Sequence, residues 1–160
     1  MNNTWHQQIM RVQYKDTDQM GVVHHANYVS LFEVGRTEWM RNAGFAYSKM
    51  ESMGLLLPVV DLNLNYLKPG RYDDVIAIFT KVSQFSKVRL QFDYEARRIG
   101  DASSFSTQLP PSGQIDTPHG ELLASGTTLH TWVNLEWKPV RIDRVAPEVY
   151  ALLQSEEFLK

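Results

Sequence analysis

Cysteine is absent from the 160 residues of this chain. Its absence excludes a disulfide framework, a thiolate nucleophile and a thiolate-ligated metal ion, and it fits a reducing compartment. Residues 1–10 lack the basic and apolar regions of a secretory signal peptide, and the longest uncharged apolar run, near residues 53–60, is far too short to span a membrane. We therefore expect a cytoplasmic protein without a membrane span.

An excess of positive charge is also missing, since 16 Lys and Arg against 18 Asp and Glu give a formal net charge of -2. Nucleic-acid affinity depends largely on basic surface, so the composition does not favour DNA or RNA as a partner. The chain does have 43% hydrophobic and 21% charged residues, which suit the core and the surface of one compact domain. We expect residues 1–160 to form a single domain.

The hydrophobic pattern predicts one long helix and several strands. Apolar or small residues recur every three or four positions over residues 27–42, as in an amphipathic helix. Apolar and polar residues alternate instead in the segments expected to be strands, which are 9–14, 62–66, 74–82, 88–97 and 122–133. Shorter helices are expected at 47–53 and from Pro147 onward, and residues 137–142 are expected to continue or flank the last strand.

This order of elements predicts an α+β domain in which an antiparallel sheet packs on a single helix. The predicted helix is only about 24 Å long, so it covers part of one face of the sheet. We expect a second subunit to bury the remainder.

Residues 102–119 interrupt this pattern, because a hairpin between residues 100–101 and 120–121 would close without them. Loops of this length are usually functional or disordered. The serine, proline and glycine content favours disorder or a loosely packed elaboration, and a lid over a ligand is the alternative.

The segment 12–28, VQYKDTDQMGVVHHANY, combines acidic residues, a glycine turn and the start of the long helix. A site that attacks a polarised carbonyl group needs a base or nucleophile opposite donors aimed at the developing oxyanion. Asp16 and Asp18 supply carboxylates, and the helix start supplies unpaired backbone N–H groups. Aspartates also hydrogen-bond backbone amides in ordinary turns, and this simpler interpretation stays open for both.

The spacing DxDxxGxVxxxxY, made by Asp16, Asp18, Gly21, Val23 and Tyr28, resembles the 4-hydroxybenzoyl-CoA thioesterase branch of the hotdog-fold acyl-CoA thioesterases. The resemblance extends through the helix, the PVVDLNLNYLKP segment and the later strands, and includes the Tol-Pal-associated thioesterases. It implies a hotdog fold, in which an antiparallel sheet wraps around one long helix. It also implies a homodimer or homotetramer that binds acyl-CoA where two subunits meet, with no cofactor.

The resemblance assigns the catalytic carboxylate to Asp18, acting as a nucleophile or as a general base, and carbonyl polarisation to the backbone N–H near His25. We expect Asp16 to organise the loop, and Asn27 to cap the helix or support the Asp18 loop. The His25 side chain is either satisfied by its surroundings or forms a wall of the pocket. Metal binding is not expected, because His24 and His25 should point apart on an extended chain.

The remaining candidates line the expected substrate site. By resemblance, the acyl group and thioester contact the loop, the helix start and the strand after it, at Gly21, Val22, Tyr28, Val59, Val60 and Asn63. Core packing explains the two valines equally well. Lys87 and Arg89 match positions that bind CoA phosphates, although ordinary solvated strand residues explain them too.

Three functions are compatible with these residues. The first is an acyl-CoA thioesterase that releases a carboxylic acid and CoA. The second is a non-catalytic acyl-CoA-binding or lipid-binding hotdog protein, which the presence of Asp18 disfavours. The third is a hotdog dehydratase, whose site resembles a histidine-centred arrangement rather than this aspartate-centred one.

Overall fold

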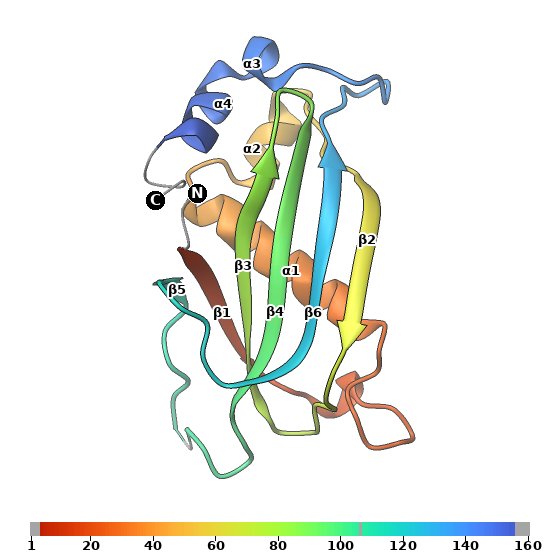
Figure 1. Ribbon diagram of the computed structural model, residues 1–160, viewed down its shortest axis with the longest axis vertical. Coiled ribbons are helices and arrows are strands. Elements are labelled where there is room, and N and C mark those ends of the chain that lie inside the picture. Colours follow the sequence, from red (N-terminus) through yellow and green to blue (C-terminus); the bar gives the residue numbers. More distant parts are fainter. Residues whose placement is uncertain (1–3, 106, 156–160) are drawn as a thin grey trace.

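A six-stranded antiparallel sheet packs against one long helix in the computed structural model, which describes residues 4–105 and 107–155 (Figure 1). The strands are β1 (Trp5–Arg11), β2 (Val59–Tyr66), β3 (Val75–Phe85), β4 (Arg89–Gly100), β5 (Gly113–Ile115) and β6 (Glu121–Thr131). Their order in the sheet is β2-β6-β4-β3-β1-β5, and every neighbouring pair is antiparallel. The α+β class predicted from the sequence is confirmed.

The long helix α1 (Asn27–Asn42) lies across one face of the sheet, as its apolar spacing predicts (Figure 1). Its buried residues are Tyr28, Phe32, Gly35, Trp39 and Met40. A Cβ atom at Gly35 would lie only 2.5 Å from the Thr80 hydroxyl oxygen, so glycine permits the close approach of α1 to β3. The shorter helices are η1 (Tyr14–Asp16, a 3-10 turn), α2 (Tyr47–Ser52), α3 (Ile142–Val145) and α4 (Pro147–Gln154). No helix within the described ranges is long and apolar enough to cross a membrane.

Two of the strand predictions differ in part from the structure. The first strand ends at Arg11, because the Asp16 carboxylate accepts the Gln13 N–H at 2.9 Å and closes a 3-10 turn in its place. Tyr14 is 80% exposed there, although its apolar character had suggested that it would be buried. Residues 137–142 form no continuous strand, since Pro139 makes only an isolated bridge to Val133 and Ile142 begins α3.

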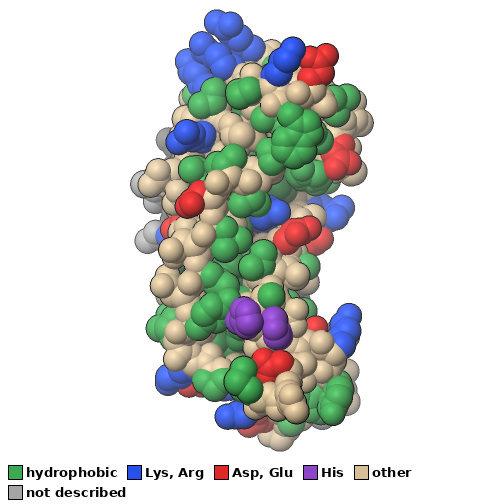
Figure 2. All heavy atoms as spheres, turned by 90° about the vertical axis from the view of Figure 1, so that its right-hand side faces the viewer, with side chains coloured by type: hydrophobic (Ala, Val, Ile, Leu, Met, Phe, Trp, Pro, Cys, Tyr) green, Lys and Arg blue, Asp and Glu red, His purple; other side chains and the backbone are tan. Residues whose placement is uncertain are grey.

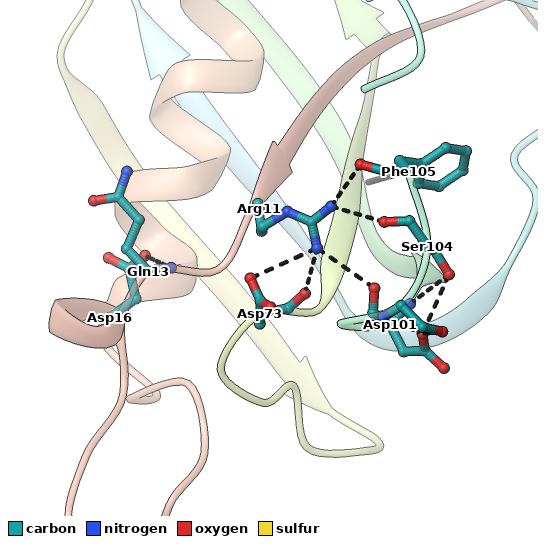
Figure 3. Close-up of polar contacts among 8 residues, drawn as sticks. Arg11, Gln13, Asp16, Asp73, Asp101, Ser104 and Phe105 are labelled. Atoms are coloured by element: carbon teal, nitrogen blue, oxygen red, sulfur yellow. Dashed lines mark hydrogen bonds and ion pairs between the residues drawn. The ribbon is translucent and has the colours of Figure 1, made fainter. Parts of the chain in front are cut away.

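The 102–119 insertion makes several contacts with the rest of the chain, although most of its described residues are exposed. The expectation of disorder or a loosely packed elaboration stays a prediction. β5 pairs with the edge of β1, with Trp5 opposite Ile115. Leu109 and Ile115 pack on a second apolar cluster on the face of the sheet away from α1. The base of the insertion is held by Arg11, whose guanidinium reaches backbone carbonyls of both Asp101 and Ser104 (Figure 3).

The two edges of the sheet differ. The short strand β5 lies at one edge, beyond β1, whereas β2 forms the other edge with no strand beside it among the described residues. Large apolar side chains of β2 remain open to solvent, with Val60 52%, Leu62 40% and Tyr66 52% exposed. The helix therefore leaves part of the sheet uncovered, as its length predicts.

Candidate active site

The Asp18 loop is a tight turn closed by its own backbone. The Gly21 N–H donates to the Asp18 carbonyl at 2.9 Å, and the Asp18 N–H donates to the Val22 carbonyl at 2.9 Å. Gly21 has a φ of 77°, in the left-handed region that favours glycine. One carboxylate oxygen of Asp18 accepts the Met20 N–H at 2.9 Å. The other has no hydrogen-bond partner within the described part of the chain, so it is free to act on a ligand.

Asp16 has the supporting role expected of it. Its carboxylate accepts the Gln13 N–H, and its carbonyl accepts the His24 N–H at 2.9 Å and the Asn27 side-chain amide at 2.8 Å. Asn27 thus supports the loop and does not cap α1, because the N-cap position is Ala26, which makes no side-chain hydrogen bond. These bonds fix the path of the chain between the Asp18 turn and the helix.

The two histidines lie in the turn before α1 with their rings stacked, 4.2 Å between centroids. The expectation that they point apart is wrong, because the chain turns here and is not extended. His24 Nδ1 accepts the Ala26 N–H at 3.2 Å. No group of three or more His, Cys, Asp or Glu side chains that could hold a metal ion occurs among residues 4–105 and 107–155.

The His25 backbone N–H precedes the first turn of α1, and no hydrogen-bond acceptor for it exists among the residues that the structure describes. An unpaired donor at a helix N-terminus favours negative charge nearby. The His25 carbonyl, on the other side of this residue, accepts the Tyr66 hydroxyl at 2.7 Å. Sequence reasoning missed Tyr66, although its place after Leu62 and Leu64 in the β2 alternation puts it on the face toward α1.

An open pocket of about 300 Å³ joins the loop, the helix start and the end of β2. It is lined by Asp18, Met20, Val22, Val23, His25, Tyr28, Tyr66, Leu67, Lys68 and Pro69. The structure thus brings together four predicted site residues, which are Asp18, Val22, His25 and Tyr28. Gly21 shapes the turn without lining the pocket. The arrangement sets a free carboxylate oxygen and an unpaired amide around a mainly apolar space, which suits attack on a carbonyl carbon.

A model of the thioesterase superfamily matches residues 20–104, more than half of the chain. This chain belongs to that superfamily. It is 34% identical over 140 residues to a putative acyl-CoA thioesterase, YneP, of Bacillus subtilis, covering 87% of this chain and 88% of the relative. It is also 35% identical over 92 residues to the acyl-CoA thioester hydrolase YbgC of Escherichia coli, covering 58% of this chain and 69% of that protein.

Solved structures agree with this assignment. The DHNA-CoA thioesterase of Staphylococcus aureus superimposes with a TM-score of 0.80 at 29% identity, covering 97% of this chain and 92% of that one. The hotdog fold implied by the sequence motif is confirmed, and the protein is a thioester hydrolase.

The Asp18 pocket rests on a polar network that sequence reasoning did not find. Lys68 Nζ lies 2.9 Å from the Glu121 carboxylate, and Arg98 joins Glu121 at 2.6 Å to Asp74 at 2.8 Å. Hydrogen bonds from Arg98 and Lys68 lower the pKa of Glu121. The Arg98 guanidinium also donates to the Pro69 carbonyl, so this network holds the 68–74 segment that lines the pocket.

The 68–74 segment in turn holds the Asp18 loop in place. The Val23 N–H donates to the Gly70 carbonyl at 2.8 Å, and a Cβ atom at Gly70 would lie only 3.1 Å from the Val23 side chain and 3.2 Å from the Tyr28 hydroxyl. Tyr28 is almost fully buried here, and burial raises the pKa of its hydroxyl. It acts in packing as well as lining the pocket.

The other predicted residues lie away from this pocket within one chain. Val59 and Val60 are exposed at the opposite end of β2, and Asn63 borders a separate polar groove with Lys81 and Asp93. Lys87 and Arg89 flank the β3–β4 turn, at the end of the sheet remote from the Asp18 loop (Figure 1). Lys87 Nζ lies 3.6 Å from the Asp143 carboxylate. The described insertion residues do not line the pocket either.

Proposed function

We propose that this thioesterase hydrolyses acyl-CoA to a free carboxylic acid and CoA. The observation that carries the proposal is the free carboxylate oxygen of Asp18, which shares a pocket with the unpaired N–H of His25. The names of the relatives YneP and YbgC support the substrate class.

In the proposed reaction the His25 N–H, aided by the dipole of α1, stabilises the negative charge that develops on the thioester oxygen. Asp18 either attacks the carbonyl carbon directly, forming an anhydride that water then hydrolyses, or removes a proton from an attacking water. In both routes the carbon–sulfur bond breaks and CoA leaves as a thiolate that gains a proton, while the oxygen of water ends in the acid. The two routes remain alternatives.

We propose that the active unit is a dimer, or a tetramer built from dimers, in which two β2 strands pair edge to edge. Antiparallel pairing about the middle of β2 brings the end of the strand that carries Val59 near Tyr66 of the partner subunit. This geometry supports Val59 and Val60 as contributions to the partner's substrate site, whereas Asn63 lies near the axis beside a separate polar groove, so its assignment rests on the sequence resemblance alone. The unpaired backbone edge and the exposed apolar side chains of β2 both favour this contact.

Lys87 and Arg89 are proposed to bind CoA phosphates of a substrate held at the partner's pocket. The same two-fold axis brings the β3–β4 end of one subunit toward the Asp18 end of the other. The Lys87 side chain is 50% exposed and Arg89 is also exposed, so both can pair with phosphate at little structural cost.

The test is release of free thiol from a panel of aromatic and aliphatic acyl-CoAs. Asp18→Asn is expected to lower kcat by about 10² or more, because the amide can neither attack nor take a proton. Asp16→Asn is the matched control, since its remaining carbonyl oxygen can still accept the Gln13 N–H. Wild-type turnover by Asp18→Asn contradicts the assignment, and tight acyl-CoA binding without any turnover identifies a binding protein instead.

A further inference from the structure

The turn at residues 134–138 carries two of the most exposed large apolar side chains of the described chain. Leu135 and Trp137 are each 66% exposed. The turn follows β6 and projects at the upper end of the sheet, on the side of the free β2 edge (Figure 1). Large apolar groups held in water are a typical mark of an interaction site.

This 134–138 turn is rigidly built. The Asn134 side-chain oxygen accepts the N–H groups of Glu136 and Lys138, both at 3.0 Å. The Asn134 carbonyl accepts the Trp137 N–H at 2.9 Å, and the Asn134 N–H donates to the Lys138 carbonyl at 2.9 Å. Trp137 has a φ of 63°, a left-handed conformation that is unfavourable in a residue with a side chain. The backbone thus holds both apolar side chains outward at an energetic cost.

The turn and the Asp18 pocket flank opposite ends of β2. Val133, next to the turn, bridges to Leu56 just before β2 begins, whereas Tyr66, Leu67 and Lys68 at the other end of β2 line the pocket. Both loops extend past the β2 edge in Figure 1. Seen from that side, hydrophobic side chains form a band along the molecule above the purple histidines (Figure 2).

We propose that Leu135 and Trp137 of one subunit form an apolar wall of the Asp18 pocket of the other subunit. This inference rests on the proposed function and on the β2 pairing. A two-fold axis through the middle of β2 exchanges its ends, so the 134–138 turn of each subunit meets the partner's pocket. Adjacent strands lie about 4.8 Å apart, and the turn extends from the second strand in from the edge, which puts it within about 10 Å of the partner's 66–69 segment.

The wall has a defined chemistry. An indole ring and a branched aliphatic chain are suited to a large apolar acyl group, and an aromatic acyl group can stack on the indole. The pocket of a single chain is open to solvent, so a wall from the partner also helps exclude water from the reacting thioester. We therefore expect Trp137 to select for aromatic or bulky acyl groups over short ones.

Cross-linking tests the contact directly, because the cysteine-free chain has no background thiols. Met20 is 76% exposed and lines the pocket, so Met20→Cys and Trp137→Cys are made in separate, differently tagged chains, then co-expressed and treated with a short bis-maleimide. A covalent dimer containing both tags is expected, with little dimer from either variant alone. Asn63→Cys, near the proposed axis, is the control for β2 pairing. A cross-link by Asn63→Cys without one between Met20→Cys and Trp137→Cys overturns the inference and leaves the dimer intact.

Kinetics distinguish failure of this inference from failure of the proposed function. Trp137→Ala is expected to lower kcat/KM about tenfold for a bulky acyl-CoA and little for acetyl-CoA. A mixed dimer of Asp18→Asn and Trp137→Ala subunits, purified through two tags, then contains one site with both changes and one with neither. It is expected to keep about half of the wild-type turnover of the bulky substrate. Unchanged selectivity of Trp137→Ala, or a mixed dimer no better than its parents, contradicts the inference. Absence of any turnover by the wild type contradicts the proposed function itself.

Discussion

A buried hydrogen-bond chain between side chains of β4 and β6 fixes the protonation state of His130, which is fully buried. His130 Nδ1 lies 3.1 Å from the Leu57 carbonyl, which can only accept, so Nδ1 carries a proton. Nε2 therefore accepts from the Thr128 hydroxyl at 2.7 Å, and Thr128 accepts from Tyr94 at 2.7 Å. Every hydrogen bond between Tyr94, Thr128, His130 and Leu57 has one donor and one acceptor when the imidazole of His130 is neutral.

Burial, with repulsion by Arg36 as a smaller cause, lowers the pKa of His130 to about 4. The unfolded chain, with its histidine pKa near 6.5, then binds a proton at higher pH than the folded protein does. We predict that the free energy of unfolding falls by up to about 3 kcal/mol as the pH decreases from 6.5 to 4, and that this contribution is complete above pH 6.5.

Urea denaturation at several pH values measures this fall. His130→Gln cannot titrate, so its stability is expected to change much less between pH 6.5 and 4, even though it is lower at neutral pH. His119→Gln, which removes an exposed histidine, is the matched substitution control. The same slope in His130→Gln and in wild type would show that other groups control acid stability.

At the scale of elements, Arg11 joins the start of the fold to the insertion (Figure 3). Its guanidinium donates to the carbonyls of Asp73, Asp101, Ser104 and Phe105 at 2.9, 3.4, 2.8 and 3.0 Å. Asp73 also lies within 3.6 Å as an ion pair. Each of the two terminal guanidinium nitrogens donates to two backbone carbonyls, so one side chain holds both ends of the 101–105 turn against β1 and the Asp73 loop.

We predict that Arg11→Ala lowers the free energy of unfolding by about 1–2 kcal/mol and makes residues 102–119 sensitive to protease, because four carbonyls lose a charged donor. Limited proteolysis and urea denaturation give the two readouts. Arg41→Ala, which loses only an exposed contact with Glu38, is the control and should cost about 0.5 kcal/mol or less. Equal losses in the two variants would rule out a special role for Arg11.

Periodicity could predict the elements whose burial alternates regularly, which is why α1 is located correctly and β4 and β6 within a few residues. It could not predict β5, because three residues carry too little pattern and are held by pairing with β1. For the site, the loop motif pointed to Asp18 and His25. Tyr66 and Lys68 were missed because their roles depend on contacts with His25 and Glu121, which are 41 and 53 positions away in the sequence.

At the scale of the whole molecule, one edge of the sheet is short and partly covered, and the other is long and open. The insertion supplies β5 beside β1 and covers apolar residues on the outer face, so that edge offers only a three-residue strand. β2 presents an eight-residue edge whose outward backbone groups are unpaired, together with exposed apolar side chains. Exposed edges of this length are usually protected from uncontrolled pairing, so a specific partner is expected on β2. The length of the helix predicted that part of the sheet would stay uncovered. Only the order of the strands shows that the uncovered edge is β2.

Leu62 is the residue that best tests this edge, since it lies next to the middle of β2, faces the α1 side and is 40% exposed. In a two-fold pair of β2 strands, Leu62→Lys brings two like charges close together and removes two apolar contacts. We predict that it weakens the dimer by at least about 10²-fold. Thioesterase activity should fall with it, because each pocket would lose the wall supplied by the partner.

Sedimentation velocity over a range of concentrations, with thiol release measured at the same concentrations, gives both quantities. Val145→Lys changes an apolar residue of α3 that is 44% exposed and distant from β2, so it should leave both unchanged. A Leu62→Lys variant that remains a fully active dimer, or a wild-type protein that is an active monomer, would show that the catalytic unit does not depend on the β2 edge.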